Sequence, residues 1–451
     1  ESTPELKDQC IFDIMQGVSI NIFIKKKDKD ASSLAQVFYK DIYGSRKLKL
    51  NFLAENKLST VDFQEIVPSA PLYIFRPHDN LLQEVYESGF KIDKLMINCV
   101  QGFKTDRDNL AIQYSKEDIE NIAFDMLNTT LSDNDFQSKY KVKDNRDWSL
   151  SEARQRIRNK KNWNDCIVKI QYRPFDVRWT LFDKILVTYP RPLIEQNFIL
   201  HPNIALGIGK SGNVIGDSEW SLVSISDIAM DINVIPRGGI YLFPLYIYDG
   251  MLQYANFTPD IVKKIESITE LFMQDCHDTE RSENGFLPID LIDYIYAVLY
   301  SPSYRDTYND FLQSDFPIIP YPNSADYFFS IAEKGKELRE LHLMKTIKQQ
   351  DIITQYPVYD ANNDNIVLSR KFVENDNDTG RVYINETQYF DNVPKDVWEM
   401  FISGYQVADK WLKDRLNKKL TNEEIIHYQK MIVAIKRTIE IQEDIDNIIR
   451  L

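Results

Sequence analysis

The spacing of apolar residues changes twice along this chain, and these changes constrain the fold more than any other feature. Residues 80–165 mostly follow the helical spacing, in which apolar side chains recur every three or four positions. Residues 166–248 instead hold short runs of β-branched and aromatic residues separated by proline, glycine and asparagine, as strands do. Residues 258–345 return to the helical spacing. A β-rich segment between two helical segments predicts a fold of mixed α and β structure.

Short signals predict where individual helices begin. Ser115 is followed three residues later by an acid at the start of SKEDIENIAFDML, an arrangement close to a capping box. Ser149 or Ser151 is the expected cap of the basic helix in SLSEARQRIRNKKNW. Thr421 and Glu424 form a capping box ahead of a long C-terminal helix with an apolar stripe.

Two segments nearer the ends have patterns of their own. Residues 9–27, QCIFDIMQGVSINIFIKKK, predict two short apolar strands on either side of Gly17. Residues 353–390 predict a small sheet with the acidic loop ENDNDTG. The sequence DVWEMFISGYQVADKWLKDRL and the residues after it predict a helical C-terminal segment.

Composition excludes several classes of protein. No run of about 18 apolar residues exists, so no membrane span is predicted. The N-terminal ESTPELKDQC lacks the basic and apolar parts of a signal peptide, and it lacks an initiating methionine, so we expect a piece of a longer protein. The four cysteines, at positions 10, 99, 166 and 276, are far apart without a CxxC pair. This favours reduced thiols in a cytoplasmic protein over zinc ligands.

Positive charge is unevenly distributed along this acidic chain. A net charge of −14 disfavours nucleic acid on average, because phosphate binding needs lysine and arginine. Binding depends on the local field, however, and residues 141–178 hold eleven Lys or Arg against five Asp or Glu. The pattern is typical of one basic surface on a large protein, and equally of a basic helix that is only solvated.

No catalytic motif is complete. GIGKSG, residues 207–212, has Ile204 where a Walker loop needs its first glycine, so we interpret it as a glycine-rich turn between strands. Pro259-Asp260 opens a helix without the Glu-x-Lys strand of a nuclease, and Asp260 suits the first turn of that helix. There is no G-x-S-x-G motif, and the five histidines share no context.

Binding is therefore the better interpretation. QYRPFDVRWTLFDKILVTYPRP, residues 171–192, places three arginines among aromatic side chains, and the basic helix leads directly into it. Arginine binds phosphates and guanine edges through paired hydrogen bonds. The alternative is that Arg173 pairs with Asp176 and only stabilises a turn. The predicted DNA-binding residues are Arg154, Arg156, Arg158, Lys160, Arg173, Arg178, Arg191 and Lys210.

Three long blocks resemble a known family. CIVKIQYRPFDVRWTLFDKILVTYPRPLIEQNF with NIALGIGKSG resembles the C-terminal specificity region of Type ISP single-polypeptide restriction-modification enzymes and their adenine methyltransferase relatives. YIYAVLYSPSYRDTYNDFLQSDFPIIPYP with KGKELRELHL, and GRVYINETQYFDNVPKDVWEMFISGYQVADKWLKDRLNKKLTNEEIIHYQKMIVAI, follow in the family's order. Together the blocks cover roughly residues 165–451. IFDIMQGVSINIFIKK resembles the last strands of the family's methyltransferase domain.

The resemblance implies a DNA target-recognition domain. In the family, the complete polypeptide methylates adenine at N6 with S-adenosylmethionine, and many members carry helicase and nuclease parts. This chain has no Pro-Pro of the family's catalytic motif, and its only Gly-x-Gly lies in the wrong region. We therefore expect no cofactor in this chain, S-adenosylmethionine in the parent enzyme, and double-stranded DNA and an upstream methyltransferase domain as partners. Base contacts are not carried over, because they change with the target.

The expected fold class is α+β, with a β-rich recognition lobe, helical lobes and a remnant of an α/β methyltransferase domain. The expected parts are the end of a methyltransferase domain (1–75), a helical connector with the basic helix (76–165), a β-rich target-recognition lobe (166–250), a helical lobe (251–350), a small β subdomain (351–400) and C-terminal helices (401–451). Two other functions stay open, namely a protein-interaction or structural module, and an enzyme that uses the 207–212 loop.

Overall fold

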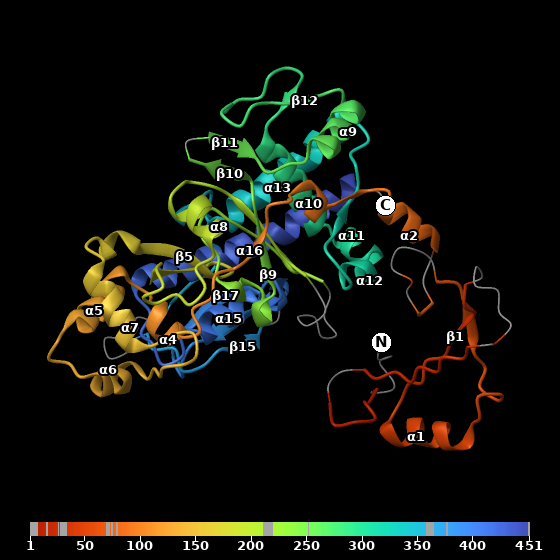
Figure 1. Ribbon diagram of the computed structural model, residues 1–451, viewed down its shortest axis with the longest axis horizontal. Helices are drawn as coiled ribbons and strands as arrows, with labels where there is room; N and C mark the ends of the chain where they lie inside the picture. The colour runs from red at the N-terminus through yellow and green to blue at the C-terminus, as the bar shows by residue number, and fades with distance from the viewer. Residues whose placement is uncertain are drawn as a thin grey trace. The chain divides into compact units, whose positions relative to one another are not determined.

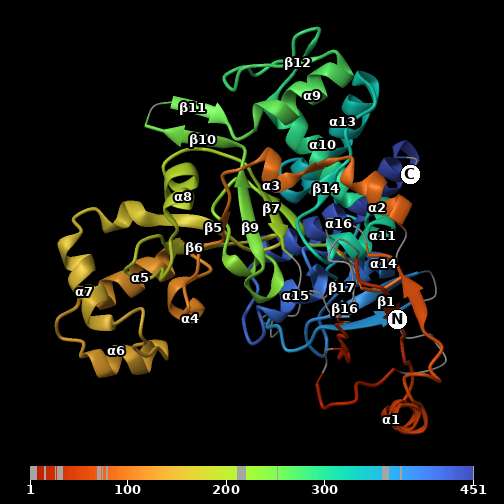
Figure 2. The same cartoon turned by 45° about the vertical axis from the view of Figure 1, so that its right-hand side comes forward.

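Helices and small sheets of two to four strands alternate along the chain, in the mixed α and β fold that the sequence predicts (Figures 1 and 2). Two compact units are present, Glu1–Ser88 and Gly89–Leu451, and each is described by itself. The finer division into six parts stays a prediction. The computed structural model describes residues 8–14, 17–25, 27, 34–68, 73, 75–77, 80–210, 220–250, 252–357, 365–375 and 378–449.

The described part of the first unit contains two strands and two helices. Its elements are β1 (Val37–Tyr39), α1 (Arg46–Glu55), β2 (Gln64–Ile66) and α2 (Asn80–Glu87). β1 and β2 pair antiparallel, and the Ser45 hydroxyl caps α1 by accepting a hydrogen bond from the Leu48 amide.

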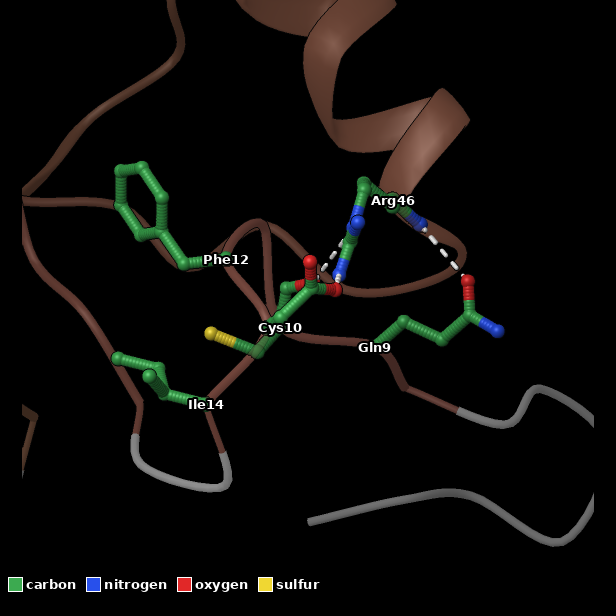
Figure 3. A pocket seen from close by; sticks show the side chains of 6 residues that line it. Gln9, Cys10, Phe12, Ile14 and Arg46 are labelled. Carbon is green, nitrogen blue, oxygen red and sulfur yellow. Dashed lines mark hydrogen bonds and ion pairs between the residues drawn. The ribbon is translucent and has the colours of Figure 1, made fainter.

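The two strands predicted within residues 9–27 are wrong, because residues 8–14 and 17–25 form no strand. Arg46 holds part of this segment against the start of α1, with Nε donating to the Cys10 carbonyl at 3.1 Å and Nη2 to Asp13 at 2.6 Å (Figure 3). The apolar side chains beyond it have no sheet to join, and Phe23 and Ile24 are 85% and 79% exposed. A strand forms only where a partner strand can satisfy its backbone groups.

The second unit begins with short elements and three longer helices. They are β3 (Phe90–Lys91), α3 (Ile92–Leu95), β4 (Val100–Gln101), α4 (Asp108–Ala111), α5 (Lys116–Leu127), α6 (Asp133–Tyr140) and α7 (Leu150–Asn159). The Ser115 and Ser149 hydroxyls accept hydrogen bonds from the amides of Asp118 and Glu152 at 3.1 and 3.4 Å. The predicted caps are confirmed, with Ser149 taking the position for which Ser151 was the alternative.

The predicted β-rich region follows. It contains η1 (Trp163–Cys166), β5 (Ile167–Arg173), β6 (Asp176–Leu181), α8 (Pro192–Ile194), η2 (Glu195–Ile199), β7 (Ala205–Gly209), β8 (Val223–Ser226), η3 (Ile232–Val234), η4 (Pro236–Gly238), β9 (Ile240–Pro244), β10 (Tyr246–Asp249) and β11 (Leu252–Ala255). β5 and β6 form a hairpin, as do β10 and β11, and a four-stranded sheet has the order β4-β9-β7-β8. The strands predicted between residues 166 and 248 are thus confirmed.

The prediction that residues 207–212 form a glycine-rich turn is wrong for Gly207 and Gly209, the first two glycines of this segment. Gly207 and Gly209 lie within β7, where a Cβ atom would stand 2.6 Å from Cδ1 of Ile240 and 2.8 Å from Cβ of Leu222. Glycine is needed here because neighbouring side chains cover the strand closely. Both residues are engaged in the sheet and do not form a phosphate-binding loop, and residues 211–219 lie outside the described part.

Helices form the centre of the second unit. The elements are α9 (Pro259–Thr269), β12 (Phe272–Met273), β13 (Gly285–Phe286), α10 (Pro288–Tyr300), α11 (Pro302–Thr307), α12 (Asn309–Leu312), β14 (Ile318–Ile319), α13 (Ala325–His342) and η5 (Gln349–Asp351). All of α10 except Ile289 is buried, because α13 and the last helix pack on it. Arg339 of α13 binds both oxygens of Asp293 of α10, at 2.6 and 2.8 Å.

A small sheet and the long last helix complete the chain. The elements are β15 (Lys371–Glu374), β16 (Thr379–Tyr383), β17 (Tyr389–Pro394), α14 (Lys395–Glu399), β18 (Phe401–Ile402), β19 (Tyr405–Gln406), α15 (Val407–Lys413) and α16 (Asn422–Ile448). The capping box of Thr421 and Glu424 is confirmed. The helix predicted from residue 396 is interrupted by the β18–β19 hairpin, because Ser403 and Gly404 have positive φ. No described helix is both long and apolar enough to cross a membrane.

Replacing Gly335 by alanine should destabilise the fold strongly. The added Cβ would overlap the carbonyl oxygen of Asp293, a backbone atom of the facing helix that cannot move alone. We expect the Gly335→Ala variant to lose about 3 kcal/mol of unfolding free energy in denaturant titrations. The matched variant Lys336→Ala places alanine at the next, exposed position and should change stability by less than about 0.5 kcal/mol. Equal destabilisation of both variants would contradict the close approach of the two helices.

The buried imidazole of His342 should make stability depend on pH. Its Nδ1 lies 2.6 Å from the Tyr296 hydroxyl and its Nε2 lies 2.9 Å from the Thr438 hydroxyl. Burial lowers the pKa of His342 to about 3, so the folded protein keeps the ring neutral while the unfolded chain takes up a proton below about pH 6.5.

Proton uptake by the unfolded chain lowers stability as the pH falls. Between about pH 7 and pH 5, the wild type should therefore lose about 2 kcal/mol more unfolding free energy than the His342→Asn variant. Denaturant titrations at both values measure this difference. The exposed His277→Asn variant serves as control and should follow the wild type. A His342→Asn variant with the same pH slope as the wild type would contradict the neutral buried ring.

Candidate nucleic-acid interface

The eight predicted DNA-binding cations divide into a buried and an accessible group. Arg154, Arg173 and Arg178 are only 6–8% exposed. Arg156, Arg158, Lys160, Arg191 and Lys210 are exposed or half-buried. The first group is buried in ion pairs inside the protein, whereas the second group keeps contact with solvent.

Arg178 belongs to a buried bridge around Asp176. The Asp176 carboxylate is 1% exposed and accepts hydrogen bonds from Arg178 Nη2 at 2.7 Å and from Arg415 Nη2 at 3.0 Å. Burial alone would raise the pKa of Asp176, but the charges of Arg415 and Arg178 outweigh it and hold the pKa well below its usual range. The guanidinium of Arg178 also lies between the rings of Tyr114 and Tyr172, at 4.2 and 4.1 Å. This arginine joins the β5–β6 hairpin to the residues after α15.

Arg173 also points inward, but its partner is not the one considered from the sequence. Its Nη1 donates to Asp231 at 2.8 Å and to the carbonyl oxygen of Tyr172 at 2.5 Å, while Asp176 is occupied by the two other arginines. Burial raises the pKa of Asp231 to about 6, against the opposing charge of Arg173. Arg173 therefore fixes the end of the hairpin to the segment after β8.

Arg154 lies on the core side of α7. Its Nη1 donates to the Leu131 carbonyl at 2.8 Å and lies 2.9 Å from Asp133, which ties α7 to the start of α6. Its guanidinium also faces the Phe136 ring. For Arg154, Arg173 and Arg178 the structure thus corrects the sequence prediction. Their guanidinium groups are ion-paired inside the protein, although the buried Nε of Arg154 and of Arg173 has no hydrogen-bond partner among the described residues, and a DNA phosphate could reach them only if these ion pairs opened.

The remaining cations of α7 do not form one stripe. Successive residues of an α-helix are rotated by about 100°, so Arg156 and Lys160 lie on one flank of the helix and Arg158 lies on the other. Arg156 Nε and Lys160 Nζ both bind Asp183, each at 2.8 Å. Arg158 is exposed and makes no ion pair with any residue that the structure describes.

Three further lysines around the hairpin are exposed. They are Lys161, Lys169 and Lys184, and none of them forms an ion pair within the described part of the chain. Lys169 faces its cross-strand neighbour Trp179, with Nζ 5.4 Å from the ring centroid. Arg158 and these lysines, here called the free cations, are among the charges of this region that phosphates can reach without breaking an ion pair.

Arg191 and Lys210 lie near the four-stranded sheet. Arg191 Nη2 is 3.4 Å from Gln101 Oε1, on β4. Lys210 follows β7, and its Nζ binds Asp315 at 3.1 Å, which raises the pKa of the lysine. A hollow beside Arg46 and a hollow of about 790 Å³ beside β15 and β16 each include none of the predicted cations.

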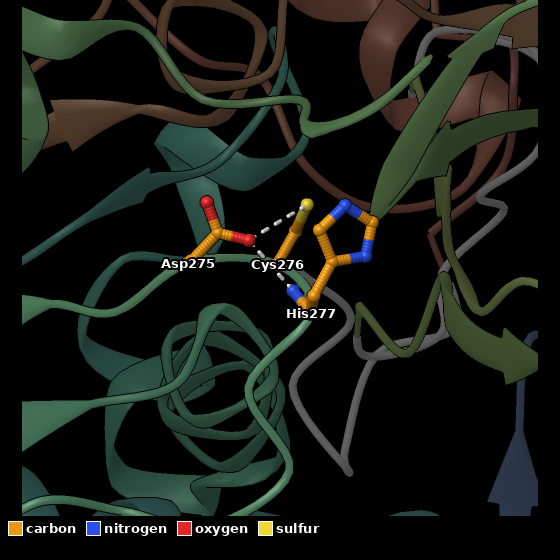
Figure 4. A group of neighbouring side chains, drawn as sticks. All are labelled: Asp275, Cys276 and His277. Carbon is orange, nitrogen blue, oxygen red and sulfur yellow. Dashed lines mark hydrogen bonds between the residues drawn. The ribbon is translucent and has the colours of Figure 1, made fainter. Parts of the chain in front are cut away.

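One group of side chains in the described part of the chain has the chemistry of metal ligands. Asp275, Cys276 and His277 place their ligand atoms within 4.8 Å of one another (Figure 4). The Cys276 thiol donates to the Gln253 carbonyl at 3.2 Å, and burial raises its pKa. Metal binding needs the thiolate, so this arrangement disfavours a metal. All four cysteines are free thiols, as the sequence predicts.

Comparison with known proteins places this arrangement in a family. Residues 94–444, well over half of the chain, match the family described as the Type ISP C-terminal specificity domain. The chain belongs to this family. A search of curated proteins gave no match for the specificity domain.

Three solved structures share the fold of the specificity domain. A nuclease-deletion mutant of the Type ISP restriction-modification enzyme LlaGI, in complex with a DNA substrate mimic, has a TM-score of 0.60 at 19% identity over 92% of this chain and 33% of that chain. The ATP-dependent Type ISP restriction-modification enzyme LlaBIII bound to DNA has a TM-score of 0.62 at 18% identity, over 91% of this chain and 28% of that chain. The DrdV–DNA complex has a TM-score of 0.63 at 18% identity, over 91% of this chain and 43% of that chain. The chain spans less than half the length of each of these chains.

Several residues that build this region were missed by sequence reasoning. Arg415 lies 239 residues beyond Asp176, and Asp231 lies 58 residues beyond Arg173. Gln101 was also missed, because β4 is only two residues long. A basic segment in the sequence shows where cations occur, but the acid that each one meets is set by distant parts of the specificity domain.

Removing the charge of Asp176 should unfold the domain at a lower denaturant concentration. The Asp176→Asn variant leaves Arg178 and Arg415 buried without their shared carboxylate, and such a change costs about 3–5 kcal/mol. Denaturant titration followed by tryptophan fluorescence measures the change. The matched variant Asp147→Asn removes an acid paired with the exposed Arg146 and should have a much smaller effect. If both variants unfold alike, the buried bridge does not stabilise the fold.

Proposed function

We propose that this specificity domain recognises a DNA target site for a restriction-modification enzyme. The observation that carries the proposal is the match of residues 94–444 to the Type ISP C-terminal specificity domain. It is supported by the fold shared with LlaGI and LlaBIII, which are described as Type ISP enzymes in complexes with a DNA substrate mimic and with DNA.

The free cations give this proposal a physical basis. Exposed lysine and arginine side chains without a carboxylate partner can bind phosphates and release condensed counterions. Such contacts hold a protein on the duplex, while contacts with base edges select the sequence. The buried arginines instead keep the hairpin in place, so their contribution to binding would be indirect.

We further propose that the parent polypeptide is an N6-adenine DNA methyltransferase that uses S-adenosylmethionine, with residues 1–75 as the end of its methyltransferase domain. Large apolar side chains are exposed through the described part of the first unit, among them Ile20, Phe23, Ile24, Leu34 and Val67. Exposed apolar surface of this kind is typical of a face that packs on another domain. An upstream methyltransferase domain is the partner we propose for it.

A second candidate is a protein-interaction or structural module of the same enzyme. One observation favours it, because the cations between Arg154 and Arg191 do not line a single face. Three are buried, and those of α7 lie on opposite flanks. DNA binding by the chain itself distinguishes the two candidates.

Binding to duplex DNA should weaken steeply as salt increases, and the free cations should set part of that dependence. We expect the variant Arg158→Ala/Lys161→Ala/Lys184→Ala to bind all duplexes more weakly. The slope of log K against log salt should become shallower by about 1 for each phosphate that the variant no longer neutralises. Fluorescence anisotropy with labelled duplexes at several salt concentrations measures the slope.

The control variant removes the same charge elsewhere. Lys263→Ala/Lys336→Ala/Lys436→Ala also changes three exposed lysines, and it should lower affinity less and leave the slope nearly unchanged. Equal effects would mean that only net charge matters, which would contradict a phosphate-binding role of the free cations. If the wild type bound no duplex at low salt, the structural-module candidate would replace target recognition.

A further inference from the structure

A row of polar side chains crosses the edge of the four-stranded sheet beside Arg191. Arg191 Nη2 donates to Gln101 Oε1 at 3.4 Å, and Gln101 Nε2 donates to the Tyr241 hydroxyl at 3.3 Å. Gln101 on β4 and Tyr241 on β9 are paired neighbours in adjacent strands, and strands β7 and β9 of this sheet lie side by side in Figure 2. All three side chains are half-buried, so each has one side in the protein and one side open to solvent. They are called the Arg191 row below.

Arg191 is the cation of this row, and the hydrogen-bonding capacity of its guanidinium is only partly used. Its hydrogen bond to Gln101 is long, its Nε is buried without a partner, and no described carboxylate pairs with it. Leaving a partly desolvated guanidinium without hydrogen-bond acceptors is costly, and such groups in native structures call for an explanation. Nearby Lys210, by contrast, is neutralised by Asp315. Acceptors supplied from outside can bind the terminal N–H groups of Arg191 without breaking any ion pair, whereas its buried Nε stays out of their reach.

The backbone holds Arg191 in an uncommon conformation. Its φ is +64°, in the region that favours glycine, and its ψ is 113°. Pro190 precedes it and Pro192 follows it, and a following proline disfavours the helical range of ψ. Strain of this kind is found where a side chain must be presented in a fixed direction. The Pro-Arg-Pro sequence therefore fixes the direction in which the Arg191 side chain leaves the backbone, which lowers part of the entropy cost of binding.

The chemistry of the row suits base edges better than phosphates alone. Arginine pairs with guanine O6 and N7, and glutamine pairs with adenine N6 and N7, each through two hydrogen bonds. Gln101 uses one N–H and one lone pair within the row, so its amide is oriented while a second N–H and a second lone pair are free for a ligand. A row that only bound phosphates would need no such oriented amide.

We propose that Arg191 and Gln101 read neighbouring base edges in a groove of duplex DNA, with Tyr241 as a positioning residue. The inference rests on the proposed function and adds the residues that determine sequence preference. Arg191 selects guanine and Gln101 selects adenine, and the free cations contribute affinity that is independent of sequence.

The test is selection from a pool of randomised duplexes by the whole chain, followed by affinity measurements on the selected duplex and its single-base-pair variants. Arg191→Ala and Gln101→Ala should each lose discrimination at one base pair, by roughly ten-fold or more, while keeping their affinity for unrelated duplexes. The Arg158→Ala variant should bind all duplexes more weakly by the same factor and keep the sequence preference of the wild type. The proposal that Arg191 and Gln101 read bases is overturned if both variants select the same sequence as the wild type with undiminished discrimination.

A further variant separates recognition from folding. Because glycine accepts positive φ without strain, Arg191→Gly should lose the same discrimination as Arg191→Ala with a melting temperature at or above that of the wild type. A large fall in melting temperature together with unchanged preference would make Arg191 structural. If the wild-type chain selected no sequence from the pool, the proposed function itself would fail. If the Arg191 and Gln101 variants bound every duplex more weakly by the same factor, Arg191 would bind phosphate only, and the base-reading role would be overturned.

Discussion

The second unit depends on the buried carboxylate of Asp176. Two guanidinium groups from segments more than 200 residues apart meet there, Arg178 in the β5–β6 hairpin and Arg415 after α15. Removing three charges from water is costly, and the cost is offset only if all remain together with their hydrogen bonds made. Arg415 makes a further bond to Glu424, a residue of the capping box of α16. The bridge thereby fixes the hairpin to the last helix.

This bridge explains why an acidic chain concentrates arginine beside aromatic residues. Arginine is suited to buried ion pairs because its planar group can bind a carboxylate through two N–H groups and stack on rings at once. Arg178 does both, and Arg173 binds Asp231 through one N–H group while it also stacks on Tyr172. The basic and aromatic pattern is therefore largely the pattern of a buried framework. The cations that can meet DNA are those that this framework leaves without acids, namely the free cations and Arg191.

The two kinds of cation suggest a division of labour in DNA recognition. The free cations lie on flexible side chains around α7 and the hairpin, which suits binding to a phosphate backbone of any sequence. The Arg191 row lies on a sheet and on a Pro-Arg-Pro segment, where the direction of each side chain is fixed. Precise positions are needed only where a particular base must be distinguished. In the proposed recognition of DNA, the rigid elements that the buried bridge holds in place would provide specificity, and the side chains of the free cations would provide affinity.

The sequence by itself determined the elements whose signals are local. It placed the helix caps at Ser115, at Ser149 or Ser151, and at Thr421, together with the β-rich region and the family, because capping and apolar spacing involve residues within a few positions of one another. Only the tertiary structure decided which cations are buried, that Arg173 meets Asp231, and that Gln101 lies beside Arg191. These outcomes depend on pairings across 58 to 239 residues, and a charge in a sequence carries no information about the distant acid or amide that will face it.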